Sequence, residues 1–176
     1  MHTQVKVGQG CGTTSVTSVD LHDISRSCAT YGISKFFVVT PLSDQKELVN
    51  KIVEHWTKGV GSRHNPDRRE ALKLISVKDS LDEVLEAVAD NGKSIPKTVV
   101  TCARPNSRNI SFDALRDKLK DGKPYLLLFG TAWGLSDDFL NSADYILEPI
   151  KGVKDYNHMS VRSAASIILS RLVETV

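Results

Sequence analysis

Two histidines, His22 and His158, are candidates for proton transfer, because imidazole titrates near neutral pH. His22 lies in the segment DLHDIS, where Asp23 falls on the same polar side of an expected helix and can orient the imidazole. His158 comes just before an expected helix, so a structural or capping role is equally open for it. Each histidine is therefore a separate candidate for acid–base chemistry.

A second group of polar side chains is basic. Residues 59–70 read GVGSRHNPDRRE, and this is the most basic short segment of the chain, with Arg63, Arg68 and Arg69. Arginine forks match phosphate geometry, so the segment is a candidate binding site for a polyanion. An ordinary solvated loop explains the same charges equally well.

The stretch 126–135, LLLFGTAWGL, is the best candidate for a ligand-binding turn. Its apolar start predicts a strand that is buried on both faces. Gly130 and Gly134 bracket the turn that follows, and glycines allow the backbone to approach a ligand closely. Open α/β sheets bind ligands at the carboxyl ends of their strands, which is where this turn is expected. Trp133 within it is either a core residue or a stacking platform for a base.

Strands and helices that could position these residues alternate along the chain. Apolar residues recur at helical spacing after Asp20, which is a suitable N-cap for this expected helix, and Gly32 ends the helix. A capping box of Ser80 and Glu83 starts another helix, closed by Asn91 and Gly92. The expected strands are 35–40, 72–77, 97–102, 126–129 and 145–147, with a short one at Val5 and Val7; the other helices follow Pro41, Ser111, Asp137 and Ser160. This alternation predicts an α/β fold, with a parallel sheet flanked by helices on both faces.

Length and composition fit one domain that spans residues 1–176, with an atypical, glycine-rich start over residues 1–12. The net charge of +2 does not by itself indicate a nucleic-acid binder. We expect no membrane span and no secretory signal. The three cysteines form no CxxC pair, which argues against a zinc site and a disulfide framework and suits a cytoplasmic protein.

Three segments in order resemble the motifs of the SPOUT class of RNA methyltransferases, of the SpoU type. Residues 20–32, DLHDISRSCATYG, resemble the first motif, with Asp20 in place of its Asn. Residues 129–135 resemble the second, with Ala132 where many members have Glu, and residues 146–165 resemble the third. The segments SVTSVDLHDISR, GVGSRHNP, GTAWGL and YNHMSVRSAA are closest to a bacterial single-domain subgroup, sometimes fused to a tRNA guanine-N1 methyltransferase.

This resemblance implies S-adenosylmethionine (SAM) as cofactor, held mainly by backbone groups in three loops. Implied cofactor-binding residues are Thr101, Cys102, Ala103, Phe129, Gly130, Thr131, Gly134, Glu148, Ile150, Asn157, Met159 and Ser160. It also implies a deep C-terminal trefoil knot. A homodimer would form through the knot and the last helix, where Ala164, Ala165 and Ser166 permit close packing.

The resemblance further implies methyl transfer to tRNA or rRNA, most simply to a ribose 2′-hydroxyl. Arg26 matches the motif arginine, and because guanidinium stays protonated we expect it to clamp a phosphate, unless it forms an ordinary ion pair with Asp23. The implied catalytic set is Arg26, His22, Asn157, His158 and Ser160, and the implied RNA-binding set is Arg63, Arg68, Arg69 and Arg162.

Three alternatives stay open at this point. The acceptor can be a base nitrogen, or the chain can be a non-catalytic module that binds RNA or a partner on the same fold. A generic nucleotide-binding protein is disfavoured, because the chain has no GxGxxG and no phosphate-loop motif.

Overall fold

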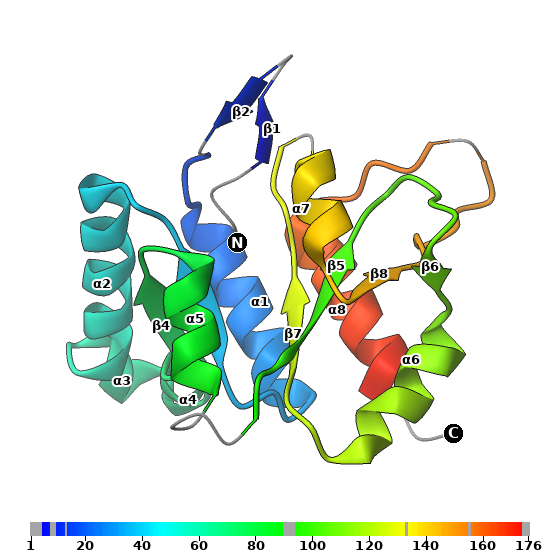
Figure 1. Cartoon of the computed structure of the whole chain (residues 1–176). Coiled ribbons are helices and arrows are strands. Elements are labelled where there is room, and N and C mark those ends of the chain that lie inside the picture. Colours follow the sequence, from blue (N-terminus) through cyan, green and yellow to red (C-terminus); the bar gives the residue numbers. More distant parts are fainter. Residues whose placement is uncertain are drawn as a thin grey trace.

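The structure is a computed structural model that describes residues 5–7, 10–12, 14–89, 94–132, 134–154 and 156–173. Strands and helices alternate through most of these residues (Figure 1). In chain order the elements are β1 (Val5–Val7), β2 (Gly10–Gly12), α1 (Ser18–Thr30), β3 (Phe36–Val39), α2 (Ser43–Thr57), α3 (Gly61–His64), α4 (Pro66–Leu72), β4 (Ile75–Lys78), α5 (Leu81–Val88), β5 (Lys97–Thr101), β6 (Asn109–Ile110), α6 (Phe112–Lys118), the 3-10 turn η1 (Leu119–Asp121), β7 (Tyr125–Leu128), α7 (Asp137–Ser142), β8 (Tyr145–Leu147) and α8 (Val161–Val173).

The strands after α1 are parallel, as the alternation predicts. Four of them form one sheet in the order β6-β8-β5-β7, and β3 pairs with β4 in a second sheet. The antiparallel hairpin of β1 and β2 stands apart at one end of the molecule (Figure 1). The expected strand at Val5 and Val7 is therefore present as β1.

The parallel strands form two sheets rather than the single sheet that we expected. An apolar groove lies between β3 and β7, lined by side chains of both strands and of α1, α5 and α8. Leu126 and Leu127 are consequently only half-buried, whereas the apolar run predicts burial on both faces. Strand β7 borders the groove, so that part of its surface lacks a neighbouring strand.

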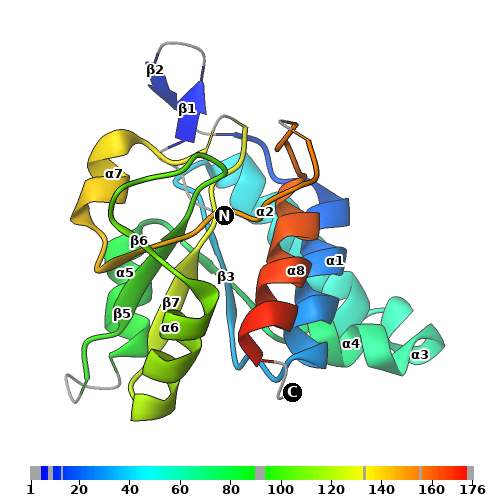
Figure 2. The ribbon, with the colours of Figure 1, turned by 90° about the vertical axis from the view of Figure 1, so that its right-hand side faces the viewer.

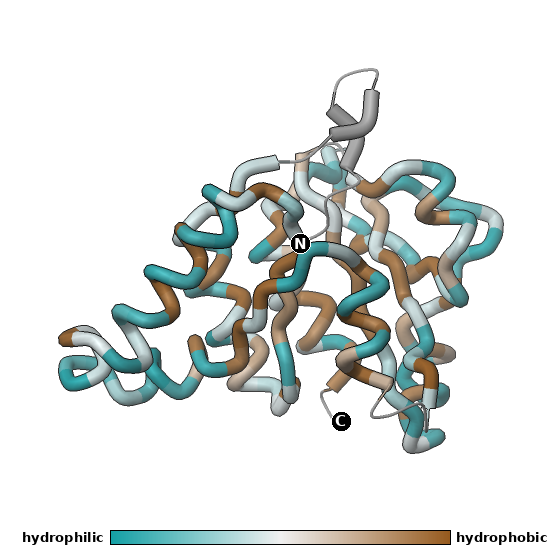
Figure 3. Tube along the Cα trace, turned by 60° about the vertical axis from the view of Figure 1, so that its left-hand side comes forward, coloured by the Kyte–Doolittle hydropathy of each residue, from teal (hydrophilic) through white to brown (hydrophobic). Residues whose placement is uncertain are grey.

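Helices cover both faces of the four-stranded sheet. On β5, Val99 faces the cluster that contains Phe112 of α6 and Ile168 of α8. The next residue, Val100, faces the opposite cluster, with Leu140 of α7. Successive side chains on a strand point to opposite faces, so each face needs its own helical cover. Figure 3 shows apolar residues concentrated along the centre of the trace, with hydrophilic residues toward the periphery.

Helices α1 and α8 pack side by side, although they lie at opposite ends of the chain (Figure 2). The hydroxyl groups of Ser27 and Ser166 are 2.7 Å apart, and Ala165 is buried in the core cluster that includes Ile24 and Cys28. Burial raises the pKa of the Cys28 thiol to about 11. The small residues expected at a dimer interface therefore include two that pack α8 against α1 within the chain.

Two expected elements begin at the wrong residue. Helix α1 starts at Ser18, and its N-cap is Thr17 rather than Asp20, because the Thr17 hydroxyl accepts a hydrogen bond from the Asp20 N–H. Leu72 ends a helix, and the strand expected over residues 72–77 is β4, displaced toward Lys78.

The expected basic loop 59–70 is instead largely helical. It forms the short helix α3 and most of α4. Asn65 caps α4 by accepting a 2.9 Å hydrogen bond from the Arg68 N–H, and Pro66 occupies the first turn, where a missing N–H costs nothing.

The other expected boundaries hold to within one or two residues. Ser80 caps α5 and Ser111 caps α6, as expected, although the Glu83 carboxylate accepts from the Asp79 N–H instead of completing the box with Ser80. The expected closure at Asn91 and Gly92 lies outside the described residues.

Candidate functional site

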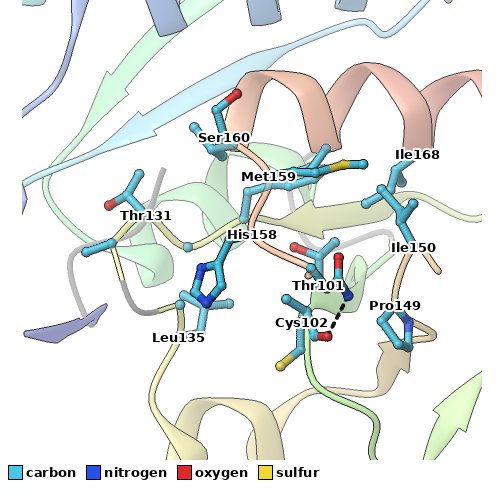
Figure 4. Close-up of a pocket in the computed structure, with 18 of the residues that line it drawn as sticks. Thr101, Cys102, Thr131, Leu135, Pro149, Ile150, His158, Met159, Ser160 and Ile168 are labelled. Carbon is cyan, nitrogen blue, oxygen red and sulfur yellow. Dashed lines mark hydrogen bonds between the residues drawn. The ribbon is translucent and has the colours of Figure 1, made fainter. Parts of the chain in front are cut away.

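A pocket of about 870 Å³ opens at the carboxyl ends of β5, β7 and β8. Its volume lies within the range of roughly 300–1,000 Å³ that is usual for small-molecule sites. The first turns of α1 and α8 complete its wall. Figure 4 shows Thr101, Thr131, Ile150, Met159 and Ile168 around this space.

The pocket brings together every residue that the motifs imply for the cofactor. These residues come from three loops far apart in sequence, and the lining also includes His158 and Arg162. The implied residues in the lining are Thr101, Cys102, Ala103, Phe129, Gly130, Thr131, Gly134, Glu148, Ile150, Asn157, Met159 and Ser160.

The turn after β7 forms a tight backbone cradle. A Cβ added to Gly130 would lie 2.7 Å from the Leu135 nitrogen and 2.9 Å from the Gly134 carbonyl carbon. Gly134 has a φ of +86°, a conformation that favours glycine. Ala132 has a φ of +50° although it carries a Cβ, so the chain turns sharply there. Trp133, next to it, lies outside the described residues.

Hydrogen bonds join the loops around the pocket. The Asn157 side-chain amide donates to the Ala103 carbonyl at 2.9 Å, which ties the loop before α8 to the end of β5. The Thr101 hydroxyl donates to the Leu128 carbonyl at 3.0 Å. Glu148 accepts from the Phe112 N–H at 2.8 Å, at the start of α6. The side chains of Thr101 and Glu148 thus hold the loops in place. The backbone groups of these loops are then the ones that can hydrogen-bond a ligand.

The segment 14–17 forms a wall of the pocket that the sequence analysis did not predict. Thr14, Ser15 and Thr17 line the pocket. The hydroxyls of Thr14 and Thr131 are hydrogen-bonded, and the Val16 N–H donates to Gln45 Oε1 at 2.8 Å. The segment belongs to no helix or strand, so residue periodicity could not indicate its role. Only its likeness to the subgroup segment SVTSVDLHDISR singled it out in the sequence. Arg104 and Pro105 after β5 also line the pocket without having been predicted.

An ion pair joins the first turns of α1 and α8 at this pocket. Arg162 Nη1 lies 3.3 Å from Asp20 Oδ1, and Arg162 Nε lies 3.5 Å from Asp23 Oδ2. Asp20 lines the pocket and is only 7% exposed, whereas the Arg162 side chain is 40% exposed.

Two residues of the expected catalytic set, His22 and Arg26, do not line the pocket. The ring of His22 packs edge-on against Trp56, with centroids 5.5 Å apart. Burial, and next the charge of Arg68, lower the pKa of His22. Its Nδ1 is buried and has no hydrogen-bond partner among the described residues. Arg26 is exposed on α1. His22 lies outside the pocket of its own chain, because its helix face packs against α2 and α4.

The other expected catalytic residues, Asn157, His158 and Ser160, do line the pocket. The Ser160 hydroxyl is 2.9 Å from the Ser163 hydroxyl at the start of α8. His158 is exposed, and its ring centroid is 6.0 Å from that of Tyr156. His158 is therefore the one histidine of the expected set that faces the pocket.

The three expected RNA-binding arginines of residues 59–70 differ in their surroundings. Arg63 is exposed at the end of α3. The Arg68 guanidinium lies over the Trp56 ring at 4.4 Å, and its Nε is buried. Arg69 pairs with Glu70 at 3.0 Å. Arg63 is thus the most accessible of the three.

Within the part of the chain that the structure describes, no group of three or more His, Cys, Asp or Glu side chains is placed to hold a metal ion. Nor does any helix in this part of the chain have the length and apolarity needed to cross a membrane.

A family model described as SAM-dependent RNA methyltransferase matches residues 2–174. Over 162 residues, 92% of the chain, the sequence is 44% identical to a tRNA (guanine-N(1)-)-methyltransferase of Nitratidesulfovibrio vulgaris and covers 38% of that protein. It is 39% identical over 160 residues to an uncharacterized protein of Aquifex aeolicus, covering 90% of the chain and 78% of that protein. The chain therefore spans about two fifths of the length of the relatives with the methyltransferase name.

Solved structures share the fold. The SpoU methyltransferase AviRb of Streptomyces viridochromogenes, solved in complex with AdoMet, aligns with a TM-score of 0.58 at 21% identity. The alignment covers 90% of the chain and 54% of that protein. This likeness confirms the expected fold class, with parallel strands flanked by helices.

Proposed function

The chain belongs to the family of SAM-dependent RNA methyltransferases, and on this premise we propose that it transfers a methyl group from SAM to a nucleotide of tRNA. The observation that carries the proposal is the pocket itself. Every residue that the family resemblance implies for the cofactor lies in its lining, at the carboxyl ends of the parallel strands.

The chemistry of the pocket fits SAM. Ile150, Ile168 and Leu135 offer apolar surface for the adenine ring, and the turn at Gly130 is tight enough that a methyl group would strike backbone atoms. Backbone N–H and C=O groups can hydrogen-bond adenine and ribose without a particular side chain. When bound, SAM would supply a methyl group on a positively charged sulfur; the acceptor would bond to the methyl carbon as the carbon–sulfur bond breaks, and S-adenosylhomocysteine would be the leaving group.

The residues of the chain then have two tasks, which are to align the acceptor and to receive its proton. Asn157 joins two of the loops and Ser160 lies at the start of α8, so both shape the end of the pocket nearest that helix. His158 brings an imidazole to the pocket lining and is our candidate for the residue that receives this proton.

We propose a ribose 2′-hydroxyl as the acceptor, on the basis of the SpoU-type motifs. A guanine ring nitrogen is the second candidate, and the name of the relatives that are 44% and 40% identical favours it. That name belongs to proteins of which the chain matches only 38% and 37%, so it does not assign the activity to the matched part.

The proposal includes a homodimer. Val153, Tyr156 and Met159 are large apolar side chains that are exposed in the loop before α8, next to the pocket. A second copy that covers this loop would bury them, and it would bring an RNA-binding surface with Arg63 and Arg162 into one assembly. Arg26, exposed on α1 outside the pocket, would clamp a phosphate of that RNA. The trefoil knot and a cytoplasmic location, where tRNA is found, complete the proposal.

The test is methyl transfer from radiolabelled SAM to unmodified tRNA transcripts and to RNA from cells that lack the protein. Nucleoside analysis of the product separates a 2′-O-methylated nucleoside from a methylated base. No incorporation into any RNA, together with no calorimetric binding of SAM, would contradict the proposal. Binding of tRNA without binding of SAM would instead favour the non-catalytic module.

A further inference from the structure

Asp20 and Arg162 form an ion pair at the pocket. Among the described residues that line the pocket, it is the only pair of a buried carboxylate with a solvent-accessible cation. Asp20 is fixed at its other oxygen, since the Thr17 hydroxyl donates to Oδ2 at 2.5 Å. The Asp20 N–H in turn donates to the same hydroxyl at 3.2 Å. The carboxylate therefore has little freedom to turn.

This arrangement fixes the direction of the Arg162 guanidinium. The hydrogen bond from Nη1 to the buried Asp20 sets this direction, whereas Nε is only within ion-pair distance, 3.5 Å, of the exposed Asp23. A guanidinium has five N–H donors in one plane, so its Nη2 group remains for another acceptor. Since the Arg162 side chain is 40% exposed, a ligand can reach that group from outside the pocket.

We propose that Asp20 is a positioning residue, which holds Arg162 so that its remaining donors bind a phosphate of the RNA next to the acceptor nucleotide. The inference rests on the proposed function and extends it to a contact with the substrate. A planar fork suits a phosphate, and a fork held in one orientation loses less conformational freedom on binding.

The position of the pair favours RNA over the cofactor as its ligand. Asp20 and Arg162 lie in the first turns of two helices, whereas the tight turn at Gly130 and the apolar residues Leu135 and Ile150 belong to the strand ends. The cofactor fits the strand ends, and a polyanion that passes over the rim meets the exposed guanidinium.

The proposal predicts an effect opposite to that of simple electrostatics. Removing a negative charge near an RNA site should tighten RNA binding, because repulsion falls. If Asp20 instead positions Arg162, then Asp20→Asn weakens binding although it removes a negative charge. Asp23→Asn is the matched control, since it makes the same charge change at an exposed carboxylate that faces the same guanidinium.

The experiment measures the affinity of the full chain, saturated with S-adenosylhomocysteine, for bulk tRNA at several salt concentrations. We expect Asp20→Asn to weaken binding about 5- to 10-fold, roughly the value of one ordinary hydrogen bond. Asp23→Asn should leave binding unchanged or tighter. Arg162→Ala should reduce the steepness of the plot of log K for tRNA binding against log salt concentration by about 0.7–0.9. Adding Asp20→Asn to Arg162→Ala should not change the tRNA affinity further.

Several outcomes would overturn the inference. The first is that Asp20→Asn binds tRNA as tightly as Asp23→Asn does. The second is that the effects of Asp20→Asn and Arg162→Ala add in the double variant. The third is that Asp20→Asn loses as much affinity for S-adenosylhomocysteine as for tRNA, which would assign the ion pair to the cofactor. A loss of methylation rate with unchanged tRNA affinity would make Asp20 a proton acceptor instead. Arg162→Lys, which keeps the charge but not the fork, should also bind tRNA more weakly and serves if Asp20→Asn does not fold.

The wild-type chain separates this inference from the proposed function. If the wild-type chain binds tRNA but transfers no methyl group, the proposed function fails. The tRNA affinities of the Asp20→Asn and Asp23→Asn variants then still decide whether Asp20 positions Arg162. If it binds no tRNA even at low salt, both fail.

Discussion

The side-chain amide of Asn157 donates a hydrogen bond to the backbone carbonyl of Ala103 at 2.9 Å, and so joins two pocket loops that are 54 residues apart in sequence. Asn157→Ala removes this bond, which is worth about 0.5–1.5 kcal/mol. We expect SAM to bind about 2- to 12-fold more weakly, as measured by calorimetry. Asn50→Ala, which makes the same change at an exposed asparagine of α2 outside the pocket lining, is the control. Unchanged SAM affinity in Asn157→Ala would show that this bond does not shape the cofactor site.

Gly130→Ala tests the tight turn after β7. The added methyl group would meet backbone atoms at 2.7 and 2.9 Å, so the turn must move. Forced shifts of this kind cost about 1–3 kcal/mol, and we expect SAM affinity to fall roughly tenfold or more.

Gly152→Ala is the matched control for this substitution, since its nearest contacts would be at 3.5 and 3.6 Å, an ordinary van der Waals distance. We expect SAM affinity close to that of the wild type. If both variants bind SAM equally well, the backbone of the turn at Gly130 does not form the cofactor site.

Arg68 contributes to stability more than Arg63 does. Its guanidinium lies 4.4 Å from the Trp56 ring centroid, and Arg63 is exposed. We expect Arg68→Met to lower the free energy of unfolding by about 0.5–2 kcal/mol, the range of cation–π contacts. Arg63→Met should change it by less than about 0.5 kcal/mol. Urea unfolding measures both, and a larger loss in Arg63→Met would contradict the packing role of Arg68.

His22 should make stability depend on pH. Its pKa in the folded chain is lowered from 6.5, chiefly by burial. The unfolded chain therefore binds a proton at a higher pH than the folded chain, so the free energy of unfolding falls as the pH drops below about 6.5. His22→Gln should lose this part of the slope between pH values of about 7.5 and 5.5. Equal slopes in urea unfolding would contradict the assignment.

The loops of the pocket could be predicted because they follow recognisable strands. The apolar run before Gly130 and the strand before Ala103 place their turns at one edge of a parallel sheet, and Asn157 and Met159 precede the amphipathic helix α8. Resemblance to known motifs then identified which turns belong together. Neither the strand pattern nor the motif resemblance depends on how the helices pack against each other.

The features that sequence reasoning missed depend on that packing. His22 and Asp23 were expected together on the polar side of α1, yet Asp23 pairs with Arg162 whereas His22 packs against Trp56. The segment at Thr14 becomes a wall of the pocket only through its contact with Thr131. The groove between β3 and β7 was also not predictable, because an apolar run does not report whether two strands are hydrogen-bonded to each other.

The most direct test of the account is a crystal structure of the full chain with S-adenosylhomocysteine bound. We expect the ligand among the loops 101–103, 129–134 and 148–150, with Asn157 and Met159 over it and Arg162 at the open rim. A ligand bound elsewhere on the molecule, or no binding at saturating concentration, would contradict the claim that this pocket is the cofactor site.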